Sequence, residues 1–308
     1  FLKMDCTIYA PGAGIFSHNF RENRPAPGQT PVRTQKVTEC KNSGKNIPLP
    51  GLRGFFENVI ILTDRKERSD RQMGERLEEI RVYWNQRAEG YAQSNREELE
   101  GEARRYWEGQ LRQSLEGKTY KKVLDIGCGP GFFSVLLAQM GYEVTAVDYT
   151  ENMLAEARKN ADAYGVNVDF RKMDAQNLAF PDESFDFVVS RNVLWNLEAP
   201  EHAYKEWLRV LRNGGSLMNC DGNFYYYVKD AEYGDRMRWE HKHMEGVNAA
   251  PIDRIGELLP MARELRPGWD VQTLKKMGAV YVDGSVTREQ TLADGHQLIL
   301  NFVIRAVK

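Results

Sequence analysis

Cysteine is scarce in this sequence, and the few cysteines lie far apart. The 308 residues include four, with no two separated by a spacing of two residues: Cys6, Cys40, Cys128 and Cys220. Disulfide frameworks and zinc sites need cysteines at short, regular spacings. We therefore expect free thiols in a reducing compartment and no metal site.

An excess of charge is also missing, as is any long apolar run. The 42 Lys and Arg residues nearly balance the 44 Asp and Glu residues, which leaves a formal net charge of -2. A clear basic excess is typical of proteins that bind nucleic acid, so we expect no such partner. No apolar run approaches the roughly 20 residues that cross a bilayer, and no secretory signal pattern opens the sequence. We expect a cytoplasmic protein without a membrane span.

The residue pattern changes near position 71. Residues 1–70 are largely rich in Pro, Gly, Asn, Ser and Thr without a sustained period, which predicts an irregular N-terminal extension. From Arg71 apolar residues recur every three or four positions, which predicts helices over residues 71–116. These helices would open a single domain that spans residues 71–308.

Strand and helix patterns alternate from Lys121 to Cys220, and two more strand patterns lie near the end of the sequence. Such alternation predicts an α/β fold with right-handed crossovers and helices on both faces of the sheet. The closing pair predicts an antiparallel edge. We expect a doubly wound, mostly parallel sheet of seven strands, with its ligand at the carboxyl ends of the strands.

The stretch VLDIGCGPGFF sets three glycines between a strand and a helix. Asp125 precedes Gly127, Gly129 and Gly131. Glycines let a ligand approach the main chain without an intervening side chain. A dinucleotide turn would carry its third glycine where Phe132 stands, and a carboxylate at Asp125 would repel a pyrophosphate. The turn therefore predicts a ligand that carries a cation.

The motif DIGCGPG resembles motif I of the class I S-adenosylmethionine-dependent methyltransferases, and the similarity spans about Arg71 to Lys308. The segment YWNQRAEGY is similar to the first helix of the subset related to ubiquinone and menaquinone biosynthesis methyltransferases (type 11), where that helix covers the cofactor. The resemblance implies a Rossmann-like methyltransferase fold, S-adenosylmethionine as cofactor and S-adenosylhomocysteine as product. It also implies that the segment after strand five, residues 222–267, is a helical insertion that caps the acceptor.

The resemblance implies roles for individual residues. Asp148 would bind the ribose hydroxyls, Asp174 would accept a hydrogen bond from the adenine amine, and Met153 would pack on the adenine. The whole cofactor-binding set that it implies is Tyr91, Asp125, Gly127, Cys128, Gly129, Gly131, Asp148, Tyr149, Met153, Asp174, Ala175, Gln176, Arg191 and Asn192.

Attack on a sulfonium methyl is an in-line displacement that needs no enzyme nucleophile. It needs a general base only if the acceptor must lose a proton. His241 and Tyr226 are the candidate catalytic residues. We expect a small-molecule acceptor, and a homodimer is compatible with the sequence. The alternatives are a nicotinamide-dependent oxidoreductase and a non-catalytic regulatory protein that binds S-adenosylmethionine.

Overall fold

The structure is a computed structural model that describes residues 52–234 and 242–308, with side chains described from residue 74 onward. The chain divides into two compact units, Phe1–Asn58 and Val59–Lys308. Helix α1 spans Leu52–Glu100, so the prediction of irregular structure is wrong for residues 52–70. That stretch contains many charged helix formers, which a search for apolar periodicity does not register. Residues 1–51 lie outside the described part.

Helices over residues 71–116 are confirmed. The remainder of α1 is followed by α2 (Glu102–Leu115), and the break between the two helices falls at Gly101. Gly101 has extended backbone angles, which end the helical geometry there. No helix in the described ranges is both long and apolar enough to cross a bilayer.

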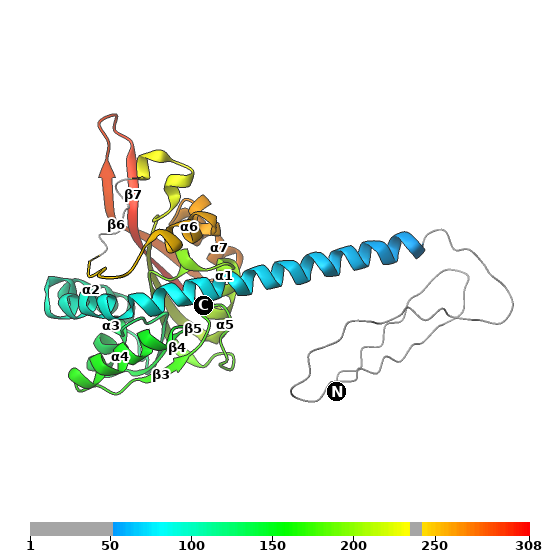
Figure 1. Ribbon diagram of the computed structural model, residues 1–308. Coiled ribbons are helices and arrows are strands. Elements are labelled where there is room, and N and C mark those ends of the chain that lie inside the picture. The colour runs from blue at the N-terminus through cyan, green and yellow to red at the C-terminus, as the bar shows by residue number, and fades with distance from the viewer. Residues whose placement is uncertain (1–51, 235–241) are drawn as a thin grey trace. The chain divides into compact units, whose positions relative to one another are not determined.

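A single sheet of seven strands organises the second unit, in the order β3-β2-β1-β4-β5-β7-β6 (Figure 1). Strands β1 to β5 pair in parallel, whereas β7 runs antiparallel to both β5 and β6. The predicted doubly wound sheet with a C-terminal antiparallel pair is therefore confirmed. The strands are β1 (Lys122–Ile126), β2 (Glu143–Asp148), β3 (Asp169–Lys172), β4 (Phe185–Arg191), β5 (Leu211–Gly222), β6 (Tyr281–Thr291) and β7 (Gln297–Val307).

Helices pack on both faces of this sheet because alternate strand residues point to opposite sides. Val123 is fully buried in a cluster with residues of α2 and α3, whereas its neighbour Leu124 is buried with residues of α5 and α7. Pro200 opens α5, where its missing N–H costs no hydrogen bond. The covering helices are α3 (Phe132–Gln139), α4 (Glu151–Ala163), α5 (Pro200–Val210) and α7 (Gly268–Lys276).

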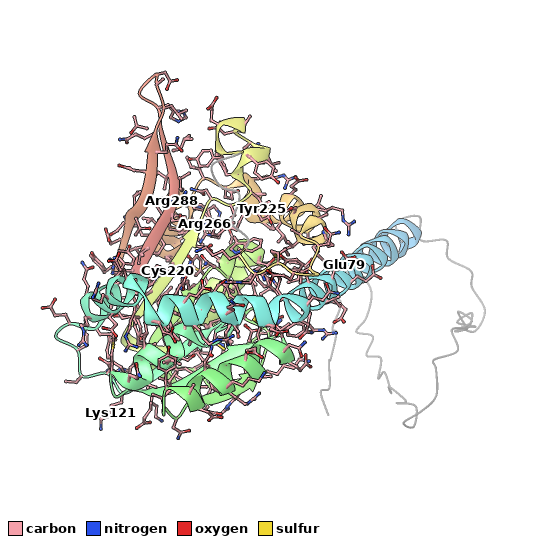
Figure 2. The ribbon with its side chains drawn as sticks, turned by 60° about the vertical axis from the view of Figure 1, so that its left-hand side comes forward. Glu79, Lys121, Cys220, Tyr225, Arg266 and Arg288 are labelled. Carbon is pink, nitrogen blue, oxygen red and sulfur yellow. The ribbon has the colours of Figure 1, made fainter. Side chains whose placement is uncertain are left out.

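Short helices fill the connection between β5 and α7, and we call residues 223–267 the cap. Its aromatic side chains form a cluster with residues of α1. Tyr225, labelled in Figure 2, belongs to this cluster, and a Cβ added to Gly256 would lie 2.5 Å from its ring. The described cap helices are η2 (Tyr226–Val228), η3 (Ala231–Tyr233), α6 (Ala250–Leu258) and η4 (Pro260–Arg263).

Three charged side chains lie together in the interior where the cap meets the sheet. Arg266 donates to Asp221 Oδ2 at 2.7 Å and to both carboxylate oxygens of Asp270, and all three side chains are 0% exposed. Tyr204 also donates to Asp270 Oδ1, at 2.6 Å. The guanidinium therefore has full charge compensation, which a buried charge requires.

Removal of one carboxylate from this cluster should be strongly destabilising. We expect Asp221→Ala to lower the free energy of unfolding by about 2–5 kcal/mol, because it leaves the Nη1 group of Arg266 and the N–H of Trp195 buried without their acceptor. Urea unfolding measures the change. Arg105→Ala is the control, since Arg105 and its partner Glu102 are 79% and 96% exposed, and it should cost less than about 1 kcal/mol. Equal losses in the two variants would contradict the expectation.

Candidate functional site

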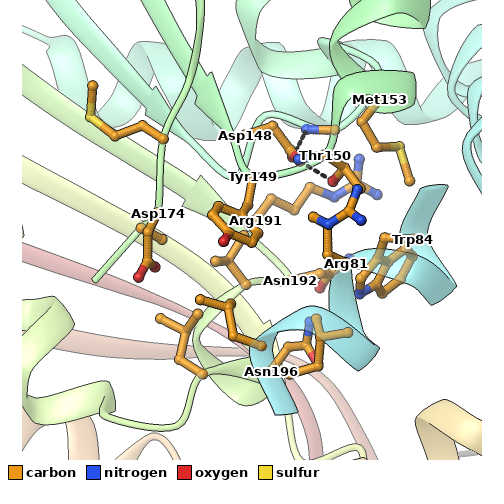
Figure 3. Close-up of a pocket in the computed structure, with 18 of the residues that line it drawn as sticks. Arg81, Trp84, Asp148, Tyr149, Thr150, Met153, Asp174, Arg191, Asn192 and Asn196 are labelled. Atoms are coloured by element: carbon orange, nitrogen blue, oxygen red, sulfur yellow. Dashed lines mark hydrogen bonds between the residues drawn. The ribbon is translucent and has the colours of Figure 1, made fainter. Parts of the chain in front are cut away.

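A pocket of about 110 Å³ lies at the carboxyl ends of β1, β2 and β4, beside the point where the strand order reverses. Helix α1 covers it, and Figure 3 shows Arg81 and Trp84 of that helix across the pocket from Asp174. The predicted cofactor residues that line the pocket are Tyr91, Gly127, Gly129, Asp148, Tyr149, Met153, Asp174, Ala175, Arg191 and Asn192.

The glycine turn forms one wall of the pocket. Gly127, Gly129 and Gly131 have φ angles of 62°, 52° and 86°, in the left-handed region that side chains disfavour. A Cβ on Gly127 would also lie 2.3 Å from Val193 Cγ2, so the turn and the end of β4 touch without room for a side chain. A Cβ on Gly129 would face the ring of Tyr91 at 3.5 Å. The turn thus offers bare main chain to the pocket.

Asp148 ends β2 and is held by its neighbours. Its carboxylate accepts hydrogen bonds from the N–H groups of Gly129 and Thr150, both at 2.9 Å, and from the Thr150 hydroxyl. Burial raises the pKa of Asp148, and these hydrogen bonds oppose the rise. The carboxylate is fixed in direction at the pocket wall and has lone pairs left for a ligand.

Asp174 lies at the opposite side of the pocket, after β3. Its oxygens accept hydrogen bonds from the N–H of Gln176 at 2.9 Å and from the side chain of Asn177 at 3.1 Å. Gln176 does not line the pocket. It is 6% exposed, and its Oε1 accepts from the N–H of Ala199 at 2.7 Å, so it joins the Asp174 loop to the start of α5.

Arg191 reaches the pocket with its charge already paired. The carboxylate of Glu98 in α1 accepts hydrogen bonds from both terminal nitrogens of Arg191, at 2.7 and 2.9 Å. The guanidinium carbon also lies 4.8 Å from the ring centre of Trp107 and 4.9 Å from that of Phe132. The next residue, Asn192, has a φ of 59°, a left-handed conformation that asparagine tolerates better than most residues.

Three further predicted cofactor residues lie behind the pocket wall. Asp125 is 2% exposed and accepts a hydrogen bond from the Ser134 hydroxyl at 2.6 Å. Cys128 is buried, and burial raises the pKa of its thiol. Gly131 packs against Ala157, where an added Cβ would lie 3.3 Å from the alanine Cβ. These residues therefore pack behind the glycine turn, and the side chain of Asp125 does not line the pocket.

Tyr226, one of the two candidate catalytic residues, does not join this set. Tyr226 packs in the cap, with its ring centre 5.1 Å from that of Tyr233, and it does not line the pocket. His241 lies outside the described residues. Within the described ranges, no group of three or more His, Cys, Asp and Glu side chains is arranged to hold a metal ion.

Sequence reasoning missed the residues that α1 contributes besides Tyr91. Leu77, Ile80 and Trp84 line the pocket, and they belong to the same apolar stripe of α1. Their spacing of three and four residues was a usable signal, because a helix that covers a pocket turns one stripe toward it.

Arg87 of α1 has another role than to line the pocket. It is 4% exposed and donates to the main-chain carbonyls of His243 and Lys242 at 2.8 and 3.1 Å. The His243 ring contacts Glu97 at 2.8 Å, and a Cβ on Gly90 would lie 2.0 Å from the His243 oxygen. These contacts hold residues 242 and 243 of the cap against α1.

Asp125 should make stability depend on pH. Burial raises its pKa to about 7 from an ordinary value of 3.8, so the folded protein favours the protonated carboxyl. The contribution of Asp125 to folding stability is then full below about pH 4, is lost between about pH 4 and 7, and is level above. Asp125→Asn should be more stable than the wild type at pH 8 by up to several kcal/mol, and equal to it near pH 4. Urea unfolding at both pH values without ligand measures this, and a difference independent of pH would contradict it.

The family description "Methyltransferase domain" matches residues 124–219, which contain the glycine turn, Asp148, Asp174 and Arg191. A phosphatidylethanolamine N-methyltransferase of Cereibacter sphaeroides is 37% identical over 155 residues, which cover 46% of this chain and 74% of that protein. A ubiquinone biosynthesis O-methyltransferase of Pseudomonas fluorescens (strain Pf0-1) is 36% identical over 128 residues, 40% of this chain and 54% of that protein. This chain thus spans about half of the second relative.

The crystal structure of a SAM-dependent methyltransferase from Aquifex aeolicus is 20% identical, with a TM-score of 0.43 over 65% of this chain and 88% of that chain. The polar groups of the pocket suit S-adenosylmethionine, because Asp148 and Asp174 offer hydrogen-bond acceptors and the glycine turn offers main chain without side chains. The chain belongs to the class I S-adenosylmethionine-dependent methyltransferases, and S-adenosylmethionine is its methyl donor.

Proposed function

We propose that the protein methylates a small molecule in the pocket beneath α1. The observation that carries the proposal is the enclosure of this pocket by α1 on one side and the glycine turn on the other. The near balance of acidic and basic residues gives no basic excess of the kind that is typical of proteins that bind nucleic acid.

The cofactor residues have the roles that the resemblance implies. In this proposal Asp148 binds the ribose hydroxyls, Asp174 accepts from the adenine amine, and Met153 packs on the adenine. The same pocket is lined by Tyr149, Ala175, Tyr91, Arg191 and Asn192. Asp125, Cys128, Gly131 and Gln176 support the loops that carry these residues.

S-adenosylmethionine supplies a methyl group that its sulfonium has already activated. The protein's part is to orient the acceptor in line with that methyl and to exclude water, which lowers the barrier by several kcal/mol. The apolar stripe of α1 supplies this enclosure. Catalytic roles for His241 and Tyr226 stay predictions.

The remaining sequence predictions belong to this proposal. Residues 71–308 are the methyltransferase domain, and residues 222–267 cap the acceptor. A cytoplasmic location is supported by Cys128 and Cys220, which are both free thiols. A homodimer stays a prediction. No observation favours a nicotinamide-dependent oxidoreductase or a non-catalytic regulatory protein.

Loss of Asp148 should abolish cofactor binding. We expect the wild type to bind S-adenosylmethionine and S-adenosylhomocysteine in the micromolar range, and Asp148→Ala to weaken both by at least 100-fold, because hydrogen bonds to a charged acceptor are lost. Isothermal titration calorimetry measures the dissociation constants. Asp169→Ala is the control, since Asp169 is exposed and pairs only locally with Arg171, and it should bind as the wild type does. Unchanged binding by Asp148→Ala would remove the proposed site.

The contact between Gly127 of the turn and Val193 after β4 should be as necessary for cofactor binding as the Asp148 carboxylate. Gly127→Ala would place its Cβ against Val193, so we expect it to lose cofactor binding. Gly141→Ala is the matched control, because Gly141 also has a positive φ of 91° but nothing within 4 Å of the new Cβ. Both substitutions strain the backbone by about 1–2 kcal/mol, and only the first distorts the pocket. Calorimetry and thermal unfolding separate the effects, and equal binding by the two variants would refute the argument.

A further inference from the structure

Asn196 is a polar residue of the pocket wall whose side chain has no role so far. It lines the pocket, and its Oδ1 is buried without a hydrogen-bond donor among the described residues. A buried acceptor without a donor is unfavourable, and most buried polar groups in folded proteins have a hydrogen-bond partner. The amide plane can turn at little cost, since the terminal torsion of asparagine is broad. A donor on a bound molecule can thus reach this oxygen from the pocket.

The backbone beneath Asn196 is firmly held. Asn196 ends the short helix η1 (Leu194–Asn196), and the N–H of Trp195 donates to Asp221 Oδ2 at 3.2 Å. The same carboxylate oxygen accepts from Arg266 at 2.7 Å, inside the buried charged cluster. Asp221 and Arg266 are therefore positioning residues for η1, and Asn196 is presented to the pocket from a fixed support.

The charges around the pocket disfavour an anionic acceptor. Arg81 donates to Glu78 at 2.8 Å and to Glu151 at 3.4 Å, and Arg191 is paired with Glu98. Neither cation of the described pocket wall is therefore left to bind a carboxylate or phosphate. Asp148 and Asp174 line the pocket and have no ion-pair partner among the described residues, which leaves its charge balance negative.

The described pocket wall also lacks a free general base. Its carboxylates are Asp148 and Asp174, which the proposed function assigns to the cofactor, and no described histidine lines it. A hydroxyl acceptor must lose its proton before or during attack, and an alkylammonium must likewise lose one before its nitrogen lone pair can attack, so the proton passes to water in either case. The negative charge balance of the described pocket wall favours an acceptor that arrives as a cation, as an amine does at neutral pH.

We infer that Asn196 binds the methyl acceptor and that this acceptor is an amine, which donates an N–H to the Asn196 oxygen. The inference rests on the proposed function of the pocket. In the step itself, the acceptor ammonium first releases one proton to water, and the nitrogen lone pair then forms the bond to the methyl carbon. The carbon–sulfur bond breaks, its electron pair goes to sulfur, and the methylated ammonium then releases a proton to water.

Binding of two probes to the protein saturated with S-adenosylhomocysteine tests the inference. Ethanolamine represents an amine acceptor and catechol a hydroxyl acceptor, and calorimetry measures each dissociation constant. Asn196→Leu removes the oxygen at similar size, whereas Asn196→Asp keeps an acceptor oxygen at the same place. We expect ethanolamine to bind the wild type, to bind Asn196→Leu about tenfold more weakly, and to bind Asn196→Asp within about threefold of the wild type. Catechol should bind none of the three measurably.

Cofactor affinity separates this inference from the proposed function. All three proteins should bind S-adenosylmethionine equally within about twofold, which also shows that the variants are folded. Failure of the wild type to bind the cofactor would overturn the proposed function itself. With the cofactor bound, three results would overturn the inference alone: ethanolamine does not bind the wild type, it binds Asn196→Leu as well as the wild type, or catechol binds in its place. Loss of cofactor affinity in Asn196→Leu would assign the residue to the cofactor, and so would also overturn it.

Discussion

The site depends on the close approach of two chain segments, the glycine turn after β1 and the residues that follow β4. Gly127 and Val193 touch where no Cβ can be accommodated, so the ends of two adjacent parallel strands lie almost in contact. That contact sets the depth of the pocket. It also fixes the positions of Asp148, which binds the N–H of Gly129, and of η1, which follows Val193 directly.

Helix α1 converts the edge of the sheet into an enclosed pocket, and polar contacts supplement the apolar packing of this helix. Asn85 makes two hydrogen bonds with Asn152 of α4, Arg76 pairs with Glu198, and Glu98 pairs with Arg191. These directional contacts fix the register of the helix over the pocket, which apolar packing alone does not specify.

The fold and the cofactor side of the pocket could be predicted because local pattern and short motifs specify them. Asp148 and Asp174 each follow a strand, and the carboxyl ends of neighbouring parallel strands meet at one edge of the sheet. The supporting roles of Asp125 and Gln176 could not be predicted in this way. Whether a side chain faces the pocket or the loop behind it depends on packing with distant residues such as Ala199.

The acceptor side was less predictable for a related reason. Tyr226 was selected for its chemistry, but its ring packs inside the cap. Contacts between residues far apart in the sequence determine that side of the pocket, such as those of Arg87 with residue 243 and of Asp221 with Arg266. No motif or period encodes pairs at such separations.

The buried cluster of Asp221, Arg266 and Asp270 links stability to the site. A buried ion pair adds little net stability over well-packed apolar residues, because desolvation offsets most of the attraction. The cluster instead fixes the orientation of Asp221, whose Oδ2 accepts hydrogen bonds from both Arg266 and the N–H of Trp195. An apolar replacement could fill the same volume but would leave that N–H without an acceptor. The cluster therefore costs desolvation energy and in return holds the segment that presents Asn196.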